Sequence, residues 1–194
     1  MGGSSADPLP LVFLDLETTG LNPGPGSWHD RICEIAALRF TGSDECDRLV
    51  TLINPQRPIP PDATAIHQIT DDMIREAPTF LQVIPELRRV VADATLVIHN
   101  APFDLGFLRA EFQRHGDAWQ ERPVVDTLIL ARRQLPTSRH SLPGLARALG
   151  IQPGGHRALG DVLTMKAVYE HLKNQEDYRA RRSVSWRPSS YRSE

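Results

Sequence analysis

The spacing of hydrophobic and polar residues changes once along the chain. Apolar, β-prone residues fill three runs at residues 11–16, 31–40 and 47–53, and the turn-forming Thr41-Gly42-Ser43-Asp44 separates the second run from the third. These runs predict three strands in a meander. From Thr79, which suits the N-cap position, apolar residues recur at the spacing of one helix face: Phe80, Val83, Ile84, Leu87, Val90 and Val91.

The rest of the chain alternates short strands with helices. Strands are predicted at residues 95–99 and 124–125, and helices at residues 102–115, 127–134, 142–149 and 160–173. Antiparallel strands followed by βα units indicate an α/β domain with helices packed on a mixed sheet. We expect this domain to span residues 9–174. Residues 1–8 are expected to form a flexible leader, and the Arg-rich residues 175–194 a disordered basic tail.

Composition narrows the class of protein. The 194 residues carry 22 Lys plus Arg against 24 Asp plus Glu, and 40% are hydrophobic, as in a soluble globular protein. No apolar run approaches the roughly 20 residues that span a bilayer, and the N-terminus lacks the pattern of a secretory signal. We therefore expect no membrane association. Cys33 and Cys46 form no Cys-x-x-Cys pair, so we expect no zinc, no disulfide framework and a cytoplasmic location.

Four carboxylates and one histidine are candidates for chemistry. Asp15 and Glu17 end the first predicted strand two residues apart, so both side chains point to one face. Like charges this close raise each other's pKa, which a cation between them would offset, but a plain acidic turn explains this pair of residues equally well. Asp104 and Asp161 each begin a predicted helix, where an acid also complements the helix dipole. His156 lies in a Gly-rich loop and could be a solvated surface residue.

Three segments together resemble the exonuclease motifs of one family. Asp15-Leu16-Glu17-Thr18-Thr19-Gly20, His99-Asn100-Ala101-Pro102-Phe103-Asp104 and His156-x-Ala158-x-x-Asp161 resemble those of the DnaQ-like 3′→5′ exonucleases of the His-containing DEDD subclass, which include the proofreading epsilon subunit of bacterial DNA polymerase III. The segment Ile66-His67-Gln68-Ile69-Thr70 resembles a further family segment near the substrate. The resemblance implies an RNase H-like fold, with a five-stranded mixed sheet whose first three strands are antiparallel and which helices flank.

The resemblance also implies a two-metal mechanism. Asp15, Glu17, Asp104 and Asp161 form an all-oxygen set suited to two Mg²⁺ or Mn²⁺ ions. In the family pattern Asp15 bridges both ions, while Glu17 and Asp161 help to hold the ion on the nucleophile side. His156 is the implied general base, because its ordinary pKa near 6.5 suits proton removal from water. The implied products are nucleoside 5′-monophosphates released from a 3′ end.

Further residues are implied to position the substrate, which is expected to be a single-stranded or frayed DNA 3′ end: Thr18, Leu21, His67, Asn100 and Phe103. His67 and Phe103 fit a place in the core equally well. Asp126 fits either an N-cap or a support of the metal site, and Arg132 and Arg133 fit either phosphate contacts or a solvated helix end.

The cellular role stays open at this stage. The resemblance implies a replicative DNA polymerase catalytic subunit as a partner, or a free-standing repair nuclease. The alternatives are an RNA-trimming enzyme like RNase T or oligoribonuclease, and a non-catalytic nucleic-acid-binding module of the same fold. The net charge is compatible with a nucleic-acid substrate. Residues 1–178 sum to −6 and residues 179–194 to +4, and bound divalent ions would offset the acidity of the core.

Overall fold

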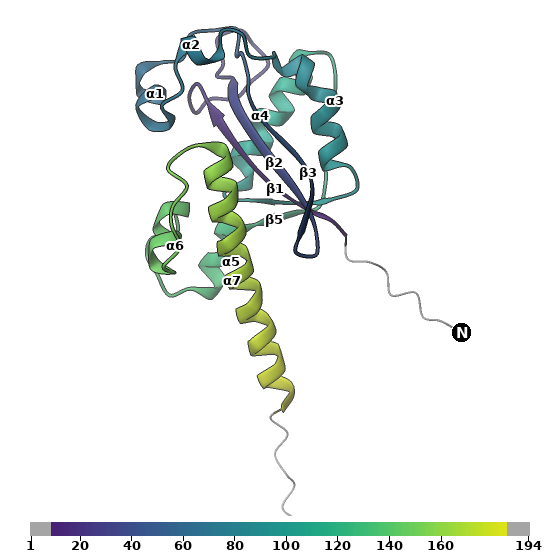
Figure 1. The fold of residues 1–194 in the computed structure, drawn as a ribbon, viewed down its shortest axis with the longest axis vertical. Helices are drawn as coiled ribbons and strands as arrows, with labels where there is room; N and C mark the ends of the chain where they lie inside the picture. The colour runs from purple at the N-terminus through teal and green to yellow at the C-terminus, as the bar shows by residue number, and fades with distance from the viewer. Residues whose placement is uncertain (1–8, 186–194) are drawn as a thin grey trace, which may run out of the picture.

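A five-stranded mixed sheet forms the centre of the molecule (Figure 1). The computed structural model describes the backbone of residues 9–185 and the side chains of residues 9–175. The strands are β1 (Leu11–Thr18), β2 (Ile32–Thr41), β3 (Asp44–Leu52), β4 (Thr95–Ile98) and β5 (Val124–Asp126), in the order β3-β2-β1-β4-β5. The first three are antiparallel, while β4 and β5 run parallel to β1. The sheet predicted from the sequence is therefore confirmed.

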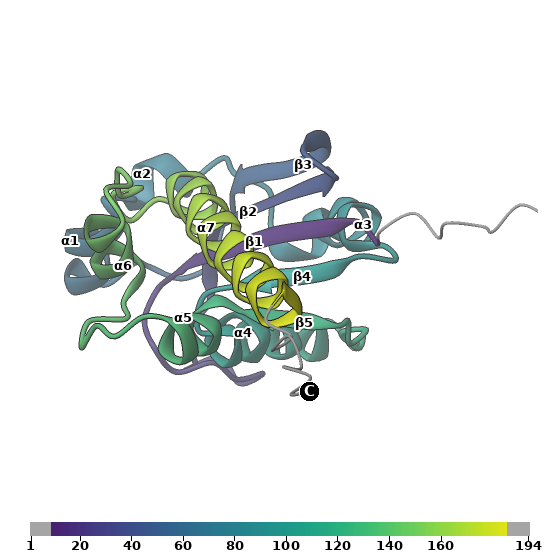
Figure 2. The same ribbon diagram turned by 90° about the horizontal axis from the view of Figure 1, so that it is seen from below.

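Helices cover both faces of the sheet (Figure 2). The helices α3 (Phe80–Val91) and α4 (Ala101–Arg114) pack on one face, and α5 (Thr127–Gln134), α6 (Leu142–Ala148) and α7 (Ala158–Ser185) pack on the other. The short helices α1 (Pro61–His67) and α2 (Asp71–Ile74) lie between β3 and α3. Within the described residues, no helix is both long enough and apolar enough to cross a membrane.

The alternation of β1 decides which of its side chains face which layer. Val12, Leu14 and Leu16 belong to the apolar cluster shared with α3 and α4. Phe13 belongs to the cluster shared with α5, α6 and α7. Because side chains alternate along a strand, Asp15 and Glu17 continue the row of Phe13 and lie on the α7 side of the sheet.

Two features differ from the sequence prediction. Helix α7 continues to Ser185, so its expected end at residue 173 is wrong. The reason is that no Gly or Pro occurs between Gly160 and Pro188 to stop the helix. Helices α1 and α2 were not predicted, because seven and four residues are too few to show a helical period. Residues 1–8 and 186–194, where the leader and the rest of the tail were expected, lie outside the described residues.

Candidate active site

The candidate site lies where β1 extends past its parallel neighbour. The pairing of β1 with β4 ends at Phe13 and Val97, so Asp15 and Glu17 lie beyond the last paired residue. The chain turns after β4 into α4, whose first turn carries Asp104. Asp104 is only 3% exposed, and its carboxylate accepts a hydrogen bond from the backbone of Leu16. This bond holds Asp104 against the end of β1.

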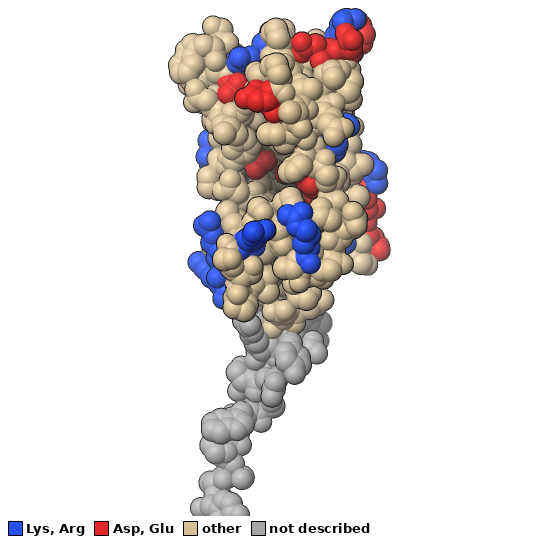
Figure 3. All heavy atoms as spheres, turned by 90° about the vertical axis from the view of Figure 1, so that its left-hand side faces the viewer, with Lys and Arg blue, Asp and Glu red and all other residues tan. Residues whose placement is uncertain are grey.

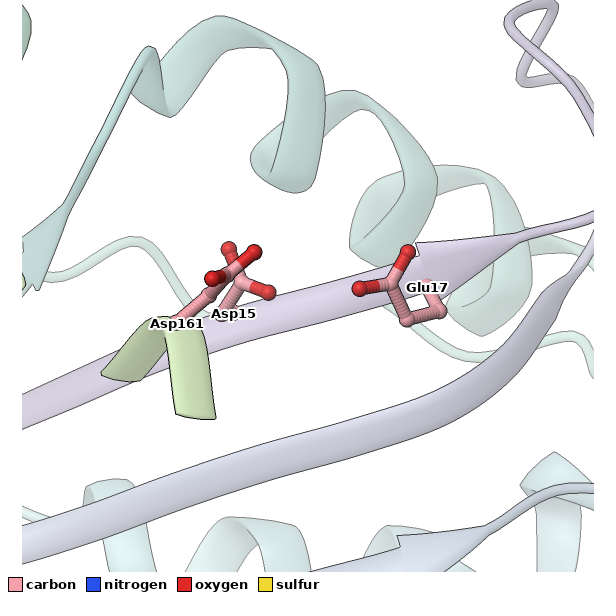
Figure 4. A group of neighbouring side chains, drawn as sticks. All are labelled: Asp15, Glu17 and Asp161. Carbon is pink, nitrogen blue, oxygen red and sulfur yellow. The ribbon is translucent and has the colours of Figure 1, made fainter. Parts of the chain in front are cut away.

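The start of α7 supplies the third acidic segment. Asp161 is 8% exposed, and its carboxylate reaches the two acids of β1. One carboxylate oxygen from each of Asp15, Glu17 and Asp161 lies within 4.8 Å of the other two. Figure 4 shows the three side chains on one side of β1, with Asp161 beside Asp15. Residues 146 positions apart in the sequence therefore form one cluster.

The clustered acids hold their protons unusually tightly. Burial, followed by the charges of Asp161 and Glu34, raises the pKa of Glu17 from 4.5 to about 8. Burial also raises the pKa of Asp15, and the charge of Asp104 adds to this effect. The pKa values of Asp104 and Asp161 are raised for the same first reason, burial. A partly buried set of carboxylates, whose like charges raise one another's pKa, fits hard divalent cations, which prefer oxygen ligands.

His156 lies on an exposed loop directly before α7. Its backbone hydrogen-bonds to the carboxylate of Asp161, and its φ of 56° is in the left-handed region. The loop is packed closely against the helix start, because a Cβ atom added to Gly154 would lie 2.0 Å from the carbonyl carbon of Gly160. Only glycine fits there. The fit fixes the base of the loop that carries the imidazole.

Glu34 is a site residue that the sequence reasoning missed. It is 4% exposed and lies opposite Glu17 in the pairing of β1 with β2. Its carboxylate accepts hydrogen bonds from Nε of Arg157 at 3.0 Å, from Nη2 of Arg157 at 2.6 Å and from the backbone of Ala158 at 3.0 Å. Glu34 thus ties β2 to the loop of His156. The available signal was a single charge inside the apolar run Ile32-Cys33-Glu34-Ile35-Ala36, which a buried strand tolerates only with a partner.

A pocket of about 220 Å³ opens beside Glu17. Four residues predicted to position the substrate line it: Thr18, Leu21, His67 and Phe103. Leu21 is 81% exposed, whereas the ring of His67 is buried and bonded within the chain. Its Nδ1 accepts a hydrogen bond from the backbone of Ile69 at 3.0 Å, and burial lowers its pKa. Asn100, the fifth predicted residue, lines a separate cavity and has a left-handed φ of 65°.

Asp126 joins two helix starts through one carboxylate. It accepts hydrogen bonds from the backbone of Leu128 and Ile129 and so caps α5. It also accepts from the backbone of Asn100 at 3.1 Å and of Ala101 at 3.0 Å, directly before α4. The N-cap role that the sequence suggested is confirmed. The same side chain also anchors the turn that leads to Asp104.

Comparison with known proteins shows the family to which the chain belongs. Residues 12–169 match the exonuclease family RNase_T. The chain belongs to this family. The RNase_T match and the similarities below confirm the resemblance to DnaQ-like exonucleases that the three motifs indicated.

Two curated relatives of this RNase_T chain are named after the epsilon subunit. The DNA polymerase III subunit epsilon of Rickettsia prowazekii (strain Madrid E) is 35% identical over 169 residues, which cover 83% of this chain and 72% of that protein. A DNA polymerase III subunit epsilon-like protein of Rhodobacter capsulatus is 39% identical over 183 residues. That match covers 88% of this chain but only 25% of the relative, so the chain spans about a quarter of its length.

A solved structure shares both sequence and fold with the chain. Exonuclease X in complex with 5′ overhanging duplex DNA is similar with a TM-score of 0.65 and 31% identity, over 85% of this chain and 92% of that one. The expected RNase H-like exonuclease fold is thereby confirmed. In this member of the exonuclease family, the carboxylates of Asp15, Glu17 and Asp161 gather near the carboxyl end of β1, the middle strand of the sheet.

Proposed function

We propose that the chain is a metal-dependent 3′→5′ exonuclease that hydrolyses the terminal phosphodiester of DNA and releases nucleoside 5′-monophosphates. The observation that carries this proposal is the meeting of Asp15, Glu17 and Asp161 oxygens within 4.8 Å. The epsilon relatives and the exonuclease X complex with DNA support DNA as the substrate. We assign the exonuclease domain to residues 9–174.

The carboxylates would hold two divalent cations, Mg²⁺ or Mn²⁺. These carboxylates offer only oxygen ligands, from Asp15, Glu17, Asp104 and Asp161. Their raised pKa values indicate that a bound cation would stabilise their ionised forms. When bound, the cations would supply an activated water and would neutralise charge on the attacked phosphate. Asp104 would be held in place for this role by its hydrogen bond to the backbone of Leu16.

The remaining residues would orient the reactants and move the proton. His156, on its exposed loop, would accept the proton of the attacking water. The hydrogen bond from its backbone to Asp161 would keep that loop beside the carboxylates. The pocket lined by Thr18, Leu21 and Phe103 would receive the terminal nucleoside, with the exposed Leu21 against the last base. Asp126 would support the site by fixing the turn before α4.

The direct test is digestion of a 5′-labelled single-stranded DNA 20-mer with Mg²⁺ or Mn²⁺. The wild-type protein should shorten the labelled strand one nucleotide at a time, and EDTA should stop this digestion. Asp15→Asn should abolish the ladder, whereas Asp44→Asn, an exposed acid in the hairpin between β2 and β3, should leave it intact. His156→Asn should lower kcat by about 10²- to 10⁴-fold. A wild-type protein that leaves the 20-mer whole with both ions contradicts the proposal, and matched RNA digests test the sugar preference.

The epsilon relatives also support a polymerase partner. We propose that the chain acts with a replicative DNA polymerase catalytic subunit, because the Rickettsia prowazekii epsilon subunit is similar over 72% of its own length. Co-purification at native expression levels from the source cells should recover that subunit. Recovery of the exonuclease without any polymerase would instead support a free-standing nuclease.

A further inference from the structure

The stretch between Asp126 and Asp161 is free of acidic residues. Residues 127–160 contain no Asp or Glu but five arginines: Arg132, Arg133, Arg139, Arg147 and Arg157. The whole chain has more acids than bases, so this segment departs sharply from the average. It forms α5, α6 and the loops around them, on the face of the sheet to which Asp15 and Glu17 point.

Four of these arginines have no acidic partner among residues 9–175, whereas most other arginines in that range have one. Arg157 pairs with Glu34. Arg132, Arg133, Arg139 and Arg147 are exposed, and none forms an ion pair within the described residues. Most arginines elsewhere in the described part of the chain form ion pairs, as Arg31 does with Glu111 and Arg88 with Asp117. The positive charge of α5 and α6 is therefore uncompensated.

A polar cavity of about 470 Å³ lies in this basic region. Its lining includes Arg132, Ser138, His140 and Ser141, all able to donate hydrogen bonds. Nε2 of His140 is buried and has no hydrogen-bond partner among the described residues. Cation, hydroxyl and imidazole donors around one cavity form an environment that suits phosphate oxygens.

The polar cavity adjoins the candidate active site through one helix turn. Asn100 lines the polar cavity, while Phe103, three residues later, lines the pocket proposed for the terminal nucleoside. Asp126 bonds to the backbone of Asn100 and caps α5, so the two regions are held together. Figure 3 shows acidic side chains recessed in the middle of this face, with Lys and Arg side chains directly below them.

We propose that α5, α6 and the polar cavity bind the phosphates of the nucleotides upstream of the scissile bond, and so guide a single DNA strand toward the carboxylates. This inference rests on the proposed function. The terminal nucleoside enters the pocket at Phe103, and the strand leaves across Asn100 to Arg132 and Arg139. The local positive charge explains how an acidic protein binds a polyanion.

The test is the affinity for a labelled single-stranded DNA 12-mer, measured by fluorescence anisotropy with Ca²⁺ in place of Mg²⁺. Each neutralised phosphate changes the slope of log Kd against log salt by about 0.7, which is about fivefold in Kd at 0.1 M salt. Arg132→Gln with Arg139→Gln should therefore weaken binding about 25-fold and reduce the slope by about 1.4. The charge-retaining pair Arg132→Lys with Arg139→Lys should keep most of the affinity and the slope.

The matched control is Arg48→Gln with Arg88→Gln, which removes the same charge from β3 and α3. It should bind the 12-mer like the wild type. Equal affinities for the two Gln pairs overturn the inference. Wild-type hydrolysis of a p-nitrophenyl ester of thymidine 5′-monophosphate, which has no upstream phosphate, tests the proposed function separately. If the ester and DNA both stay intact while the Arg132 and Arg139 pair loses affinity, the proposed function fails and the strand-binding surface stands.

Discussion

The ion pair between Glu34 and Arg157 should stabilise both the fold and the position of the His156 loop. Glu34 comes from the second strand and Arg157 follows His156 directly, so their contact joins parts of the chain 123 residues apart. Replacing either residue breaks the same contact but leaves a different charge behind. Arg157→Gln leaves a buried carboxylate whose charge acts on Glu17, Asp15 and Asp161. Glu34→Gln leaves a guanidinium whose side chain is 42% exposed to water.

The expected loss of stability differs between the two variants because they leave different charges behind. A charge-assisted hydrogen bond contributes about 1.5–3 kcal/mol, and the partial exposure of Arg157 places the coupling at the lower end, about 2 kcal/mol. Removing one partner of a buried ion pair costs about 3–5 kcal/mol when the other charge stays buried. We therefore expect Arg157→Gln to lower the free energy of unfolding by about 3 kcal/mol and Glu34→Gln by about 2 kcal/mol.

The assay is a double-mutant cycle. Urea unfolding of the wild type, both single variants and the Glu34→Gln, Arg157→Gln double variant gives the coupling energy, and kcat on a DNA oligonucleotide gives the effect on the loop. Both single variants should lower kcat, because the loop of His156 loses its tether to β2. A coupling below about 0.5 kcal/mol, the usual error of additivity, would refute the reasoning, as would Glu34→Gln being the more damaging change.

Three further predictions concern the same site. In EDTA, the contribution of Glu17 to stability should be fully present below pH 4.5 and should be lost as the pH rises through 8, because burial raises the pKa of Glu17 from 4.5 to about 8 and the folded chain holds a proton that the unfolded chain releases. The urea midpoint of the wild type should therefore fall more over this pH range than that of Glu17→Gln, and equal falls would contradict the prediction. Asp126→Ala should lower the free energy of unfolding in urea by about 2 kcal/mol and should also lower kcat, because four backbone hydrogen bonds lose their acceptor. An unchanged kcat would show that the turn before Asp104 needs no anchor. Gly154→Ala should lower kcat at least about tenfold, because the new Cβ would lie 2.0 Å from Gly160 and displace the loop of His156; Gly106→Ala, whose Cβ would meet Pro23 at an ordinary 3.4 Å, is the control.

The sequence could predict much of the fold because its patterns are strong. The alternation in β1 and the helical period in α3 come from apolar residues that a core must bury, and both elements lie where predicted. The alternation also placed Asp15 and Glu17 on one face, and the structure puts both on the α7 side. Helix α7 extends beyond its predicted end, because charged residues allow a helix to continue after the apolar period has stopped.

The tertiary contacts of the site were beyond the sequence. The carboxylates of Asp15 and Asp161 meet only because α7 packs on the face of β1 that carries Asp15, and single residues gave no sign of that packing. The resemblance to a family supplied it instead. Glu34 was missed, and the sequence left a phosphate contact of Arg132 and Arg133 open, because the importance of these residues depends on which charges surround them in space.

The most direct test of the metal site is isothermal titration calorimetry of Mn²⁺ binding to the metal-free protein in the presence of a nucleoside 5′-monophosphate. We expect two Mn²⁺ ions per chain and the loss of both in Asp15→Asn. Binding should also release protons, because the clustered carboxylates hold them at neutral pH. Binding that Asp15→Asn leaves unchanged, or no binding to the wild type, would contradict the claim that these carboxylates form the metal site of the exonuclease.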